Sequence, residues 1–315
     1  MEPKIIGHNI IPVIVGPTCS GKTGLCLLLS ERINCEIISA DSRQIYKYLN
    51  IGTAKPSPHE LKKVKHHFID ILEPHQVYNV SRFESEALQI IEEIIIKKKI
   101  PVAAGGSGLY VKALIDGIID TVETDDEYRT ELLERKNKYG NESIYEELKK
   151  VDPESASRML PQNWKRIIRA LEVFHLTGKP IGQHHIDHNR EIKYNFMQFG
   201  LNWSRDKLYQ NIEQRVDDMI TGGLLIEVQN LIEKGYNKTL NALNTVGYKE
   251  IISYLDGEIS LERAVELIKR NTRRYAKRQL TWFRADERIK WFDVNSKDDL
   301  DNIADTIVKN LQQKE

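Results

Sequence analysis

The stretch that most constrains the fold of this chain is VGPTCSGKTG at residues 15–24, which has the G-x-x-x-x-G-K-[ST] spacing of a phosphate-binding P-loop. An apolar run at residues 11–15 comes before it, and an apolar-faced helix pattern follows over residues 22–33. In that setting the backbone N–H groups of the loop point inward, and the helix adds the positive end of its dipole. The sequence therefore predicts a strand–loop–helix unit that binds a polyphosphate, without indicating which one.

The composition excludes several classes of protein. The 315 residues carry 46 basic and 46 acidic side chains, so any polyanion must be held by local patches rather than by net charge. The three cysteines, Cys19, Cys26 and Cys35, lack metal-binding or disulfide spacing, which favours reduced thiols in the cytoplasm. No signal peptide is expected, and no apolar run approaches the roughly 18 residues of a membrane span.

The first third of the chain alternates strand and helix patterns. Further strands are expected at 35–40, 66–72 and 100–104, with a helix between the last two that begins at a capping box, Ser81-x-x-Glu84. Such alternation predicts an α/β fold with a parallel sheet covered by helices, whose site lies at the carboxyl ends of the strands.

From about residue 118 the strand signal disappears. Helix starts are expected at Thr124, Asn141, Asp152 and Asn163, and Gly178 ends the last helix before a polar loop. Strands return at 193–203 and 288–294. We therefore expect a P-loop core formed by residues 1–117 and 193–315, with an all-helical insertion domain at 118–192.

Two strand ends could supply chemistry beside the P-loop. Asp41 follows the second strand, where a carboxylate could hold Mg²⁺, orient a hydroxyl, accept a proton or simply cap a turn. Ser107 lies in the Gly-rich turn after the strand at 100–104. That strand end offers a hydroxyl and no acid, which argues against ATP hydrolysis as the task.

Other charged stretches are ambiguous. Residues 270–288 could present a positive helix face with aromatic neighbours, which would suit RNA, or a solvated face over buried aromatics. Its members are Arg270, Arg273, Arg274, Lys277 and Arg278, with Tyr275, Trp282 and Phe283. His184, His185 and His188 beside Asp187 lie in the expected polar loop, where nothing would fix a metal geometry, so no metal site is assigned there.

Taken together, several stretches resemble the bacterial tRNA dimethylallyltransferases in sequence and in order. They are GPTCSGKT, ADSRQIYKYLNIGTAK, HHFIDILEP, GGSGLYVKAL, RIIRALEVF, IEQRVDDMI, VGYKEI and AKRQLTWFR. The resemblance covers nearly the whole chain, and the run from Asp41 to Lys55 is its most specific part. It implies transfer of a dimethylallyl group from dimethylallyl diphosphate to the exocyclic amine of adenosine 37 of tRNA, beside the anticodon.

The resemblance also implies roles for individual residues. Asp41 would be the general base, Ser107 a hydroxyl near the reacting groups, and Lys22 and Arg215 would stabilise the departing diphosphate. Mg²⁺ would bind beside Thr23. The diphosphate cradle would comprise Gly16, Pro17, Thr18, Cys19, Ser20, Gly21, Lys22 and Thr23.

The tRNA partner would be bound at several places along the chain. The implied contacts are Asp41, Ser42, Arg43, Gln44, Ser107, Arg129, Lys165, Arg166, Ile167, Ile168, Arg169, Asn244, Thr245, Val246, Gly247, Tyr248 and Lys249. A cytoplasmic monomer is expected. The alternatives are prenylation of free AMP, a small-molecule kinase and a non-catalytic RNA-binding protein.

Overall fold

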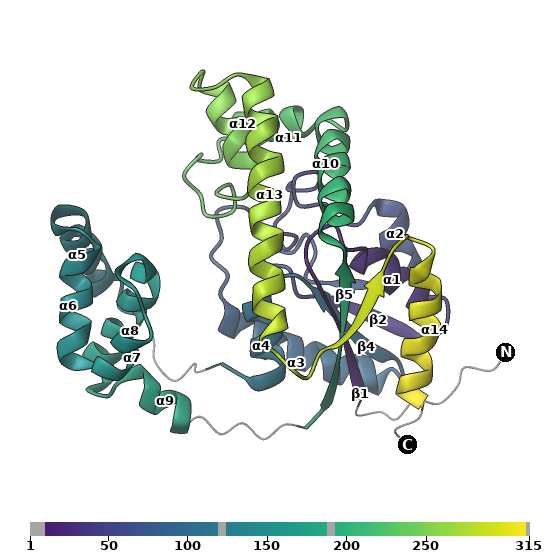
Figure 1. Cartoon of the computed structure of the whole chain (residues 1–315), viewed down its shortest axis with the longest axis horizontal. Helices are drawn as coiled ribbons and strands as arrows, with labels where there is room; N and C mark the ends of the chain where they lie inside the picture. Colours follow the sequence, from purple (N-terminus) through teal and green to yellow (C-terminus); the bar gives the residue numbers. More distant parts are fainter. Residues whose placement is uncertain (1–9, 119–123, 188–192, 313–315) are drawn as a thin grey trace. The chain divides into compact units, whose positions relative to one another are not determined.

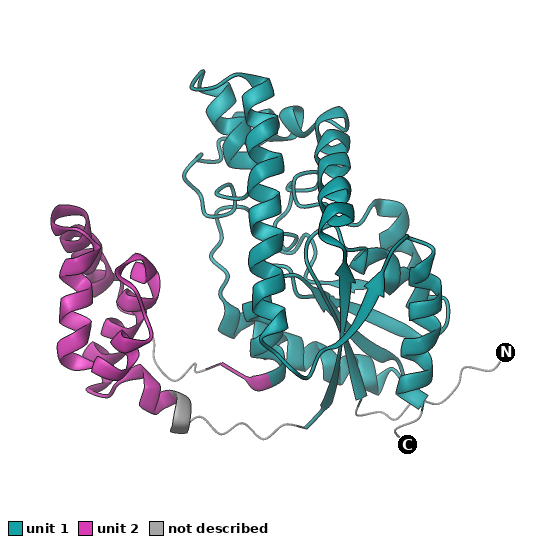
Figure 2. Ribbon diagram, viewed as in Figure 1, with its two compact units in different colours: residues 1–115, 192–315 teal, residues 116–191 magenta. Residues whose placement is uncertain are grey.

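The structure, a computed structural model, describes residues 10–118, 124–187 and 193–312. The chain forms two compact units (Figure 2). The first combines Met1–Ile115 with Ile192–Glu315, and the second is Asp116–Glu191.

A six-stranded sheet, in which every neighbouring pair is parallel, is the centre of the first unit, in the order β3-β2-β4-β1-β5-β6 (Figure 1). The strands are β1 (Ile10–Val15), β2 (Cys35–Ser39), β3 (His66–His67), β4 (Ile100–Gly105), β5 (Asn195–Trp203) and β6 (Lys290–Val294). Because β4 pairs with both β1 and β2, the turn after β4 lies between the P-loop and the segment that follows β2.

Helices cover both faces of this sheet. They are α1 (Lys22–Ser30), α2 (Pro58–Lys63), α3 (Val80–Ile96), α4 (Gly108–Asp116), α10 (Arg205–Thr221), α11 (Leu224–Glu233), α12 (Tyr248–Leu255), α13 (Leu261–Arg284) and α14 (Asp299–Gln312). Alternate residues of β1 enter different cores, as the two-residue period of a strand requires. Val13 belongs to the core that also holds residues of α3, α4, α11 and α12, whereas Ile14 belongs to the core that holds residues of α1 and α14.

The second unit is all helical and has its own core. Its elements are α5 (Asp126–Tyr139), α6 (Asn141–Val151), α7 (Pro153–Ser157), a 3-10 turn (Pro161–Asn163), α8 (Trp164–Thr177) and α9 (Ile181–Asp187). Leu132, Ile144, Leu148, Ile167 and Leu171 are buried together. This core shares no residue with the cores of the sheet.

Three expected details of secondary structure are wrong. The third strand ends at His67, because Phe68 and Asp70 have φ angles of 63° and 57°, outside the strand region. The cap of α3 is Asn79, which accepts the Arg82 N–H, so Ser81 lies inside the first turn. Residues 181–187 form a helix rather than a polar loop.

The histidine cluster was assigned no metal site because a polar loop was expected there, and the helix removes that reason. His184 lies on α9, where its Nε2 is 3.0 Å from the Thr177 hydroxyl. His188 lies outside the described residues. Among the residues that the structure describes, no group of three or more His, Cys, Asp or Glu side chains could hold a metal ion.

Candidate active site

The P-loop connects β1 to α1 and folds around its own lysine. Gly21, the residue before α1, has a φ of 93°, a left-handed conformation that favours glycine. The Lys22 ammonium group donates to the carbonyl oxygens of Gly16 and Pro17, at 3.0 and 2.7 Å. The Lys22 side chain therefore folds back over the P-loop, beside the space that a phosphate would occupy.

The electrostatic surroundings of Lys22 show which groups share its site. Removal from water lowers the pKa of Lys22 to about 8, and the Asp41 carboxylate opposes this change. The charge of Arg215, on α10, lowers it further. The Arg215 side chain makes no hydrogen bond or ion pair within the described ranges, and its charge acts on Lys22, so both cations could face the same anion.

Two residues of the P-loop are candidates for ligand contact beyond its amides. The Ser20 hydroxyl is buried and has no hydrogen-bond partner in the described part of the chain, although buried polar groups are normally paired. The Thr23 hydroxyl follows Lys22 in the first turn of α1. Mg²⁺ takes most of its ligands from phosphate oxygens and water, so a single protein hydroxyl is compatible with the expected magnesium site.

Asp41 lies just beyond β2, at the same edge of the sheet as the P-loop. Its Oδ1 accepts the Arg43 and Gln44 N–H groups, at 2.8 and 3.3 Å. Its Oδ2 accepts no hydrogen bond from the residues that the structure describes. The carboxylate is thus fixed through one oxygen and open through the other.

Ser107 connects Asp41 to the turn after β4. Its Oγ accepts the Ser42 N–H at 3.1 Å and lies 3.3 Å from the Ser42 hydroxyl. Tyr275 of α13 lies beside Ser107. Burial, with the Asp41 carboxylate adding to it, raises the pKa of Tyr275 to about 12, so this phenol stays protonated at neutral pH.

One face of α13 packs along this turn. Tyr275 contacts Ser107, Gln279 donates to the Gly106 carbonyl, and the Trp282 indole lies where a side chain at Gly108 would be. Gln279 was not among the predicted site residues, although the 275, 279, 282 spacing already puts all three on one helix face. Of the aromatic residues near the positive helix face at 270–288, Phe283 is buried in the core and is not exposed with the arginines.

The residues expected to contact tRNA divide into exposed and buried sets. Lys165, Arg166, Asn244 and Lys249 are exposed. Ser42, Thr245 and Val246 are partly buried.

Four of the expected tRNA contacts are buried residues. Ile167 and Ile168 face the core of the second unit. Gly247 and Tyr248 are buried in the first unit.

Several of the polar residues are already engaged within the protein. Arg129 and Arg169 both pair with the buried Glu172. The Arg43 guanidinium donates to the Asn241 carbonyl, and the Gln44 amide donates to the carbonyls of Thr53 and Ala54.

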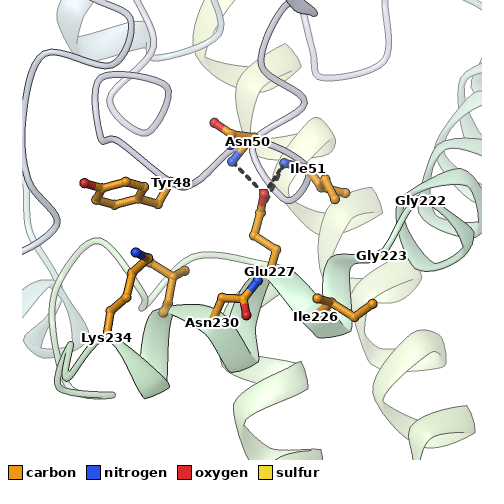
Figure 3. Close-up of a pocket in the computed structure, with 10 residues that line it drawn as sticks. Tyr48, Asn50, Ile51, Gly222, Gly223, Ile226, Glu227, Asn230 and Lys234 are labelled. Carbon is orange, nitrogen blue, oxygen red and sulfur yellow. Dashed lines mark hydrogen bonds between the residues drawn. The ribbon is translucent and has the colours of Figure 1, made fainter.

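Tyr248 instead helps to hold the loop that follows Asp41. Its hydroxyl donates to Glu227 at 2.6 Å, and the same carboxylate accepts the N–H groups of Asn50, Ile51 and Gly52. Figure 3 shows Glu227 reaching from α11 toward Asn50 and Ile51. A hollow of about 330 Å³ lies here, lined by Tyr48 and Lys234 among others, and it contains none of the expected site residues.

Comparison with known proteins identifies the family. The family model described as IPP transferase matches residues 44–286. A tRNA dimethylallyltransferase of Alkaliphilus oremlandii is 46% identical over 301 residues, which is 95% of this chain and 96% of that protein. One of Acetivibrio thermocellus is 47% identical, with 95% of each chain covered.

Solved structures agree. The tRNA isopentenylpyrophosphate transferase of Bacillus halodurans is 40% identical, with a TM-score of 0.71 and coverage of 97% of this chain and 98% of that one. A eukaryotic dimethylallyltransferase acting on tRNA, 28% identical, has a TM-score of 0.81 and coverage of 96% and 80%. This chain belongs to the IPP transferase family.

Proposed function

We propose that this protein transfers the dimethylallyl group of dimethylallyl diphosphate to the exocyclic amine of adenosine 37 in tRNA. The observation that carries the proposal is the juxtaposition of a cationic P-loop and a fixed carboxylate across one turn. Lys22 and Arg215, on the P-loop helix and on α10, lie on the donor side, and Asp41 lies on the acceptor side. Ser107 follows β4, the strand between those that lead to Lys22 and Asp41.

The reaction exchanges one bond for another. The adenine amine attacks the allylic carbon, a C–N bond forms, and the C–O bond to the diphosphate breaks. The loop amides, Lys22 and Arg215 would stabilise the leaving diphosphate, because they place positive charge where negative charge develops. Mg²⁺ beside Thr23 would supply further neutralisation of that charge.

Asp41 would take the proton. An adenine amine is a poor nucleophile whose N–H becomes acidic only as the new bond forms. A carboxylate that is ionised at neutral pH can accept this proton without being protonated beforehand. Its Oδ2 is the free oxygen, while Oδ1 is held by Arg43 and Gln44.

The finer expectations about location and assembly are also proposals. The three cysteines are buried free thiols, which is consistent with a reducing compartment such as the cytoplasm. No helix within the described ranges is long and apolar enough to cross a membrane. A monomeric state stays a prediction.

The test is incubation with Mg²⁺, labelled dimethylallyl diphosphate and either unmodified tRNA or AMP. Label should enter tRNA only, and Asp41→Asn should lower kcat by about 10²- to 10⁴-fold, the usual scale for a lost general base. Asn retains an oxygen for the Arg43 and Gln44 N–H groups, so the turn should persist. Asp206→Asn, an exposed acid at the start of α10, is the control and should retain activity.

Other outcomes would redirect the proposal. Label in AMP alone would assign the protein to adenylate prenylation. Phosphate transfer from ATP, with no label in either acceptor, would mean that the P-loop serves a kinase.

A further inference from the structure

A single side chain of α13, Gln279, bridges the two loops that would carry donor and acceptor. Its Oε1 accepts the Thr18 N–H of the P-loop at 2.8 Å. Its Nε2 donates to the Gly106 carbonyl at 2.8 Å. Gln279 is 6% exposed, and its hydrogen bond to Gly106 is buried while that to Thr18 is partly buried.

The bridge is closely fitted at Gly106. A β-carbon added there would lie 2.3 Å from the Gln279 Nε2, closer than real contacts allow. Glycine is therefore required at this position for the amide to reach the turn. The fit links a residue of α13 to the end of β4 that carries Ser107.

From Gly106 the contacts continue to the acceptor side. Ser107 follows it directly and accepts the Ser42 N–H, and Ser42 is the residue after Asp41. On the donor side, Thr18 follows Pro17, whose carbonyl accepts the Lys22 ammonium group. Hydrogen bonds and short chain segments thus join the P-loop to the carboxylate through Gln279.

We propose that Gln279 is a positioning residue, which sets the spacing between the donor diphosphate and the Asp41 carboxylate without touching either reactant. This inference rests on the proposed function. Transfer between two bound substrates requires their reacting atoms to be aligned, and a displacement of about 1 Å can cost on the order of 10²-fold in rate. An amide that holds both loops limits that displacement.

A purely structural role would be the alternative, since any buried amide with two hydrogen bonds stabilises its fold. The sheet offers a matched control in Gln198, on β5. It is also buried, and its Nε2 donates to Asp286 at 3.0 Å. Neither Gln198 nor Asp286 belongs to the P-loop or to the Gly106 turn.

The experiment compares Gln279→Met with Gln198→Met well below their unfolding temperatures. We would measure kcat, KM for tRNA and for dimethylallyl diphosphate, and the Kd of inorganic diphosphate with Mg²⁺. For Gln279→Met, kcat should fall about 10- to 100-fold. The diphosphate Kd should stay within about threefold, because Lys22 and the loop amides remain. Gln198→Met should change each constant by less than about threefold, since its hydrogen bond involves neither loop.

Equal losses of kcat in the two variants would overturn the inference, as would a loss that follows the unfolded fraction. Inactivity of the unmodified protein on tRNA would instead overturn the proposed function, and this inference with it.

A double-mutant cycle between Gly106 and Gln279 gives an independent measurement. Gly106→Ala should lower kcat about as much as Gln279→Met, because the new methyl group displaces the amide. In a Gln279→Ala background, the same Gly106→Ala change should cost little. Losses that simply multiply would show that the two positions act independently, against the proposal.

Discussion

At the scale of the residue, Lys22 has a charge that depends on pH in the neutral range. Its pKa of about 8 in the ligand-free protein means that the ammonium form prevails below pH 8 and the neutral amine above it. Only the ammonium form attracts diphosphate. Affinity for inorganic diphosphate should therefore be full near pH 7 and fall above pH 8, by up to about tenfold per pH unit for one linked proton. Titration calorimetry between pH 7 and 10 measures this.

The control for this prediction is Lys22→Arg. A guanidinium stays charged throughout that range, so the loss above pH 8 should vanish even if the overall affinity is lower. A flat profile for the unmodified protein would contradict the assignment. So would a fall in affinity that persists in Lys22→Arg.

The sequence predicts the positions of Lys22 and Asp41 because each depends on local rules, a loop spacing and the end of a strand. Gln279 could not be found that way. Its partner Thr18 is 261 residues away, and their contact depends on how α13 packs over the edge of the sheet. The buried contacts of Tyr248 were missed for the same reason, since they depend on Glu227 of another helix.

At the scale of the element, Glu227 fixes the loop after Asp41 to α11. One carboxylate accepts three backbone N–H groups and the Tyr248 hydroxyl, whose pKa burial and Glu227 raise well above its usual value. In Glu227→Gln, an amide NH₂ group replaces one carboxylate oxygen and cannot accept a hydrogen bond from the backbone N–H groups or the Tyr248 hydroxyl. It should lower the free energy of unfolding by about 1 kcal/mol, because partly buried backbone donors lose their acceptor, as measured by urea denaturation.

Glu233→Gln, an exposed acid on the same helix, makes the identical charge change and should shift stability by less than about 0.5 kcal/mol. Matching midpoints for the two variants would mean that Glu227 does not hold the loop.

Elements were predictable from periodicity where burial alone decides them. β1 and β4 are mostly buried and show as apolar runs. The end of β3 was not predictable, because it is set by left-handed backbone at Phe68, a residue type that rarely adopts this conformation.

At the scale of the whole molecule, the strand pattern is lost near residue 118, where the helical unit was expected to begin. Contacts between residues divide the chain at Asp116 and Glu191. The buried Glu172 with its partners Arg129 and Arg169 stabilises that unit internally, so these arginines are partly committed to the fold. Lys165 and Arg166 remain the exposed cations at the start of α8.

Excision of the second unit separates donor chemistry from tRNA binding. Replacement of residues 118–192 by a Gly/Ser linker of about 20 residues, which spans roughly 25 Å on average, should leave the sheet and its cores folded. The Kd for inorganic diphosphate should be unchanged, because the P-loop, Asp41 and Arg215 all belong to the first unit. Transfer to tRNA should fall by at least about tenfold if Lys165 and Arg166 contribute phosphate contacts.

Lys165→Ala with Arg166→Ala in the full-length chain is the matched variant and should reproduce part of that loss, with a weaker dependence of KM for tRNA on salt. Full transfer to tRNA by the excised protein would show that the first unit alone binds the acceptor. Loss of diphosphate binding on excision would show that the P-loop depends on the helical unit for its fold.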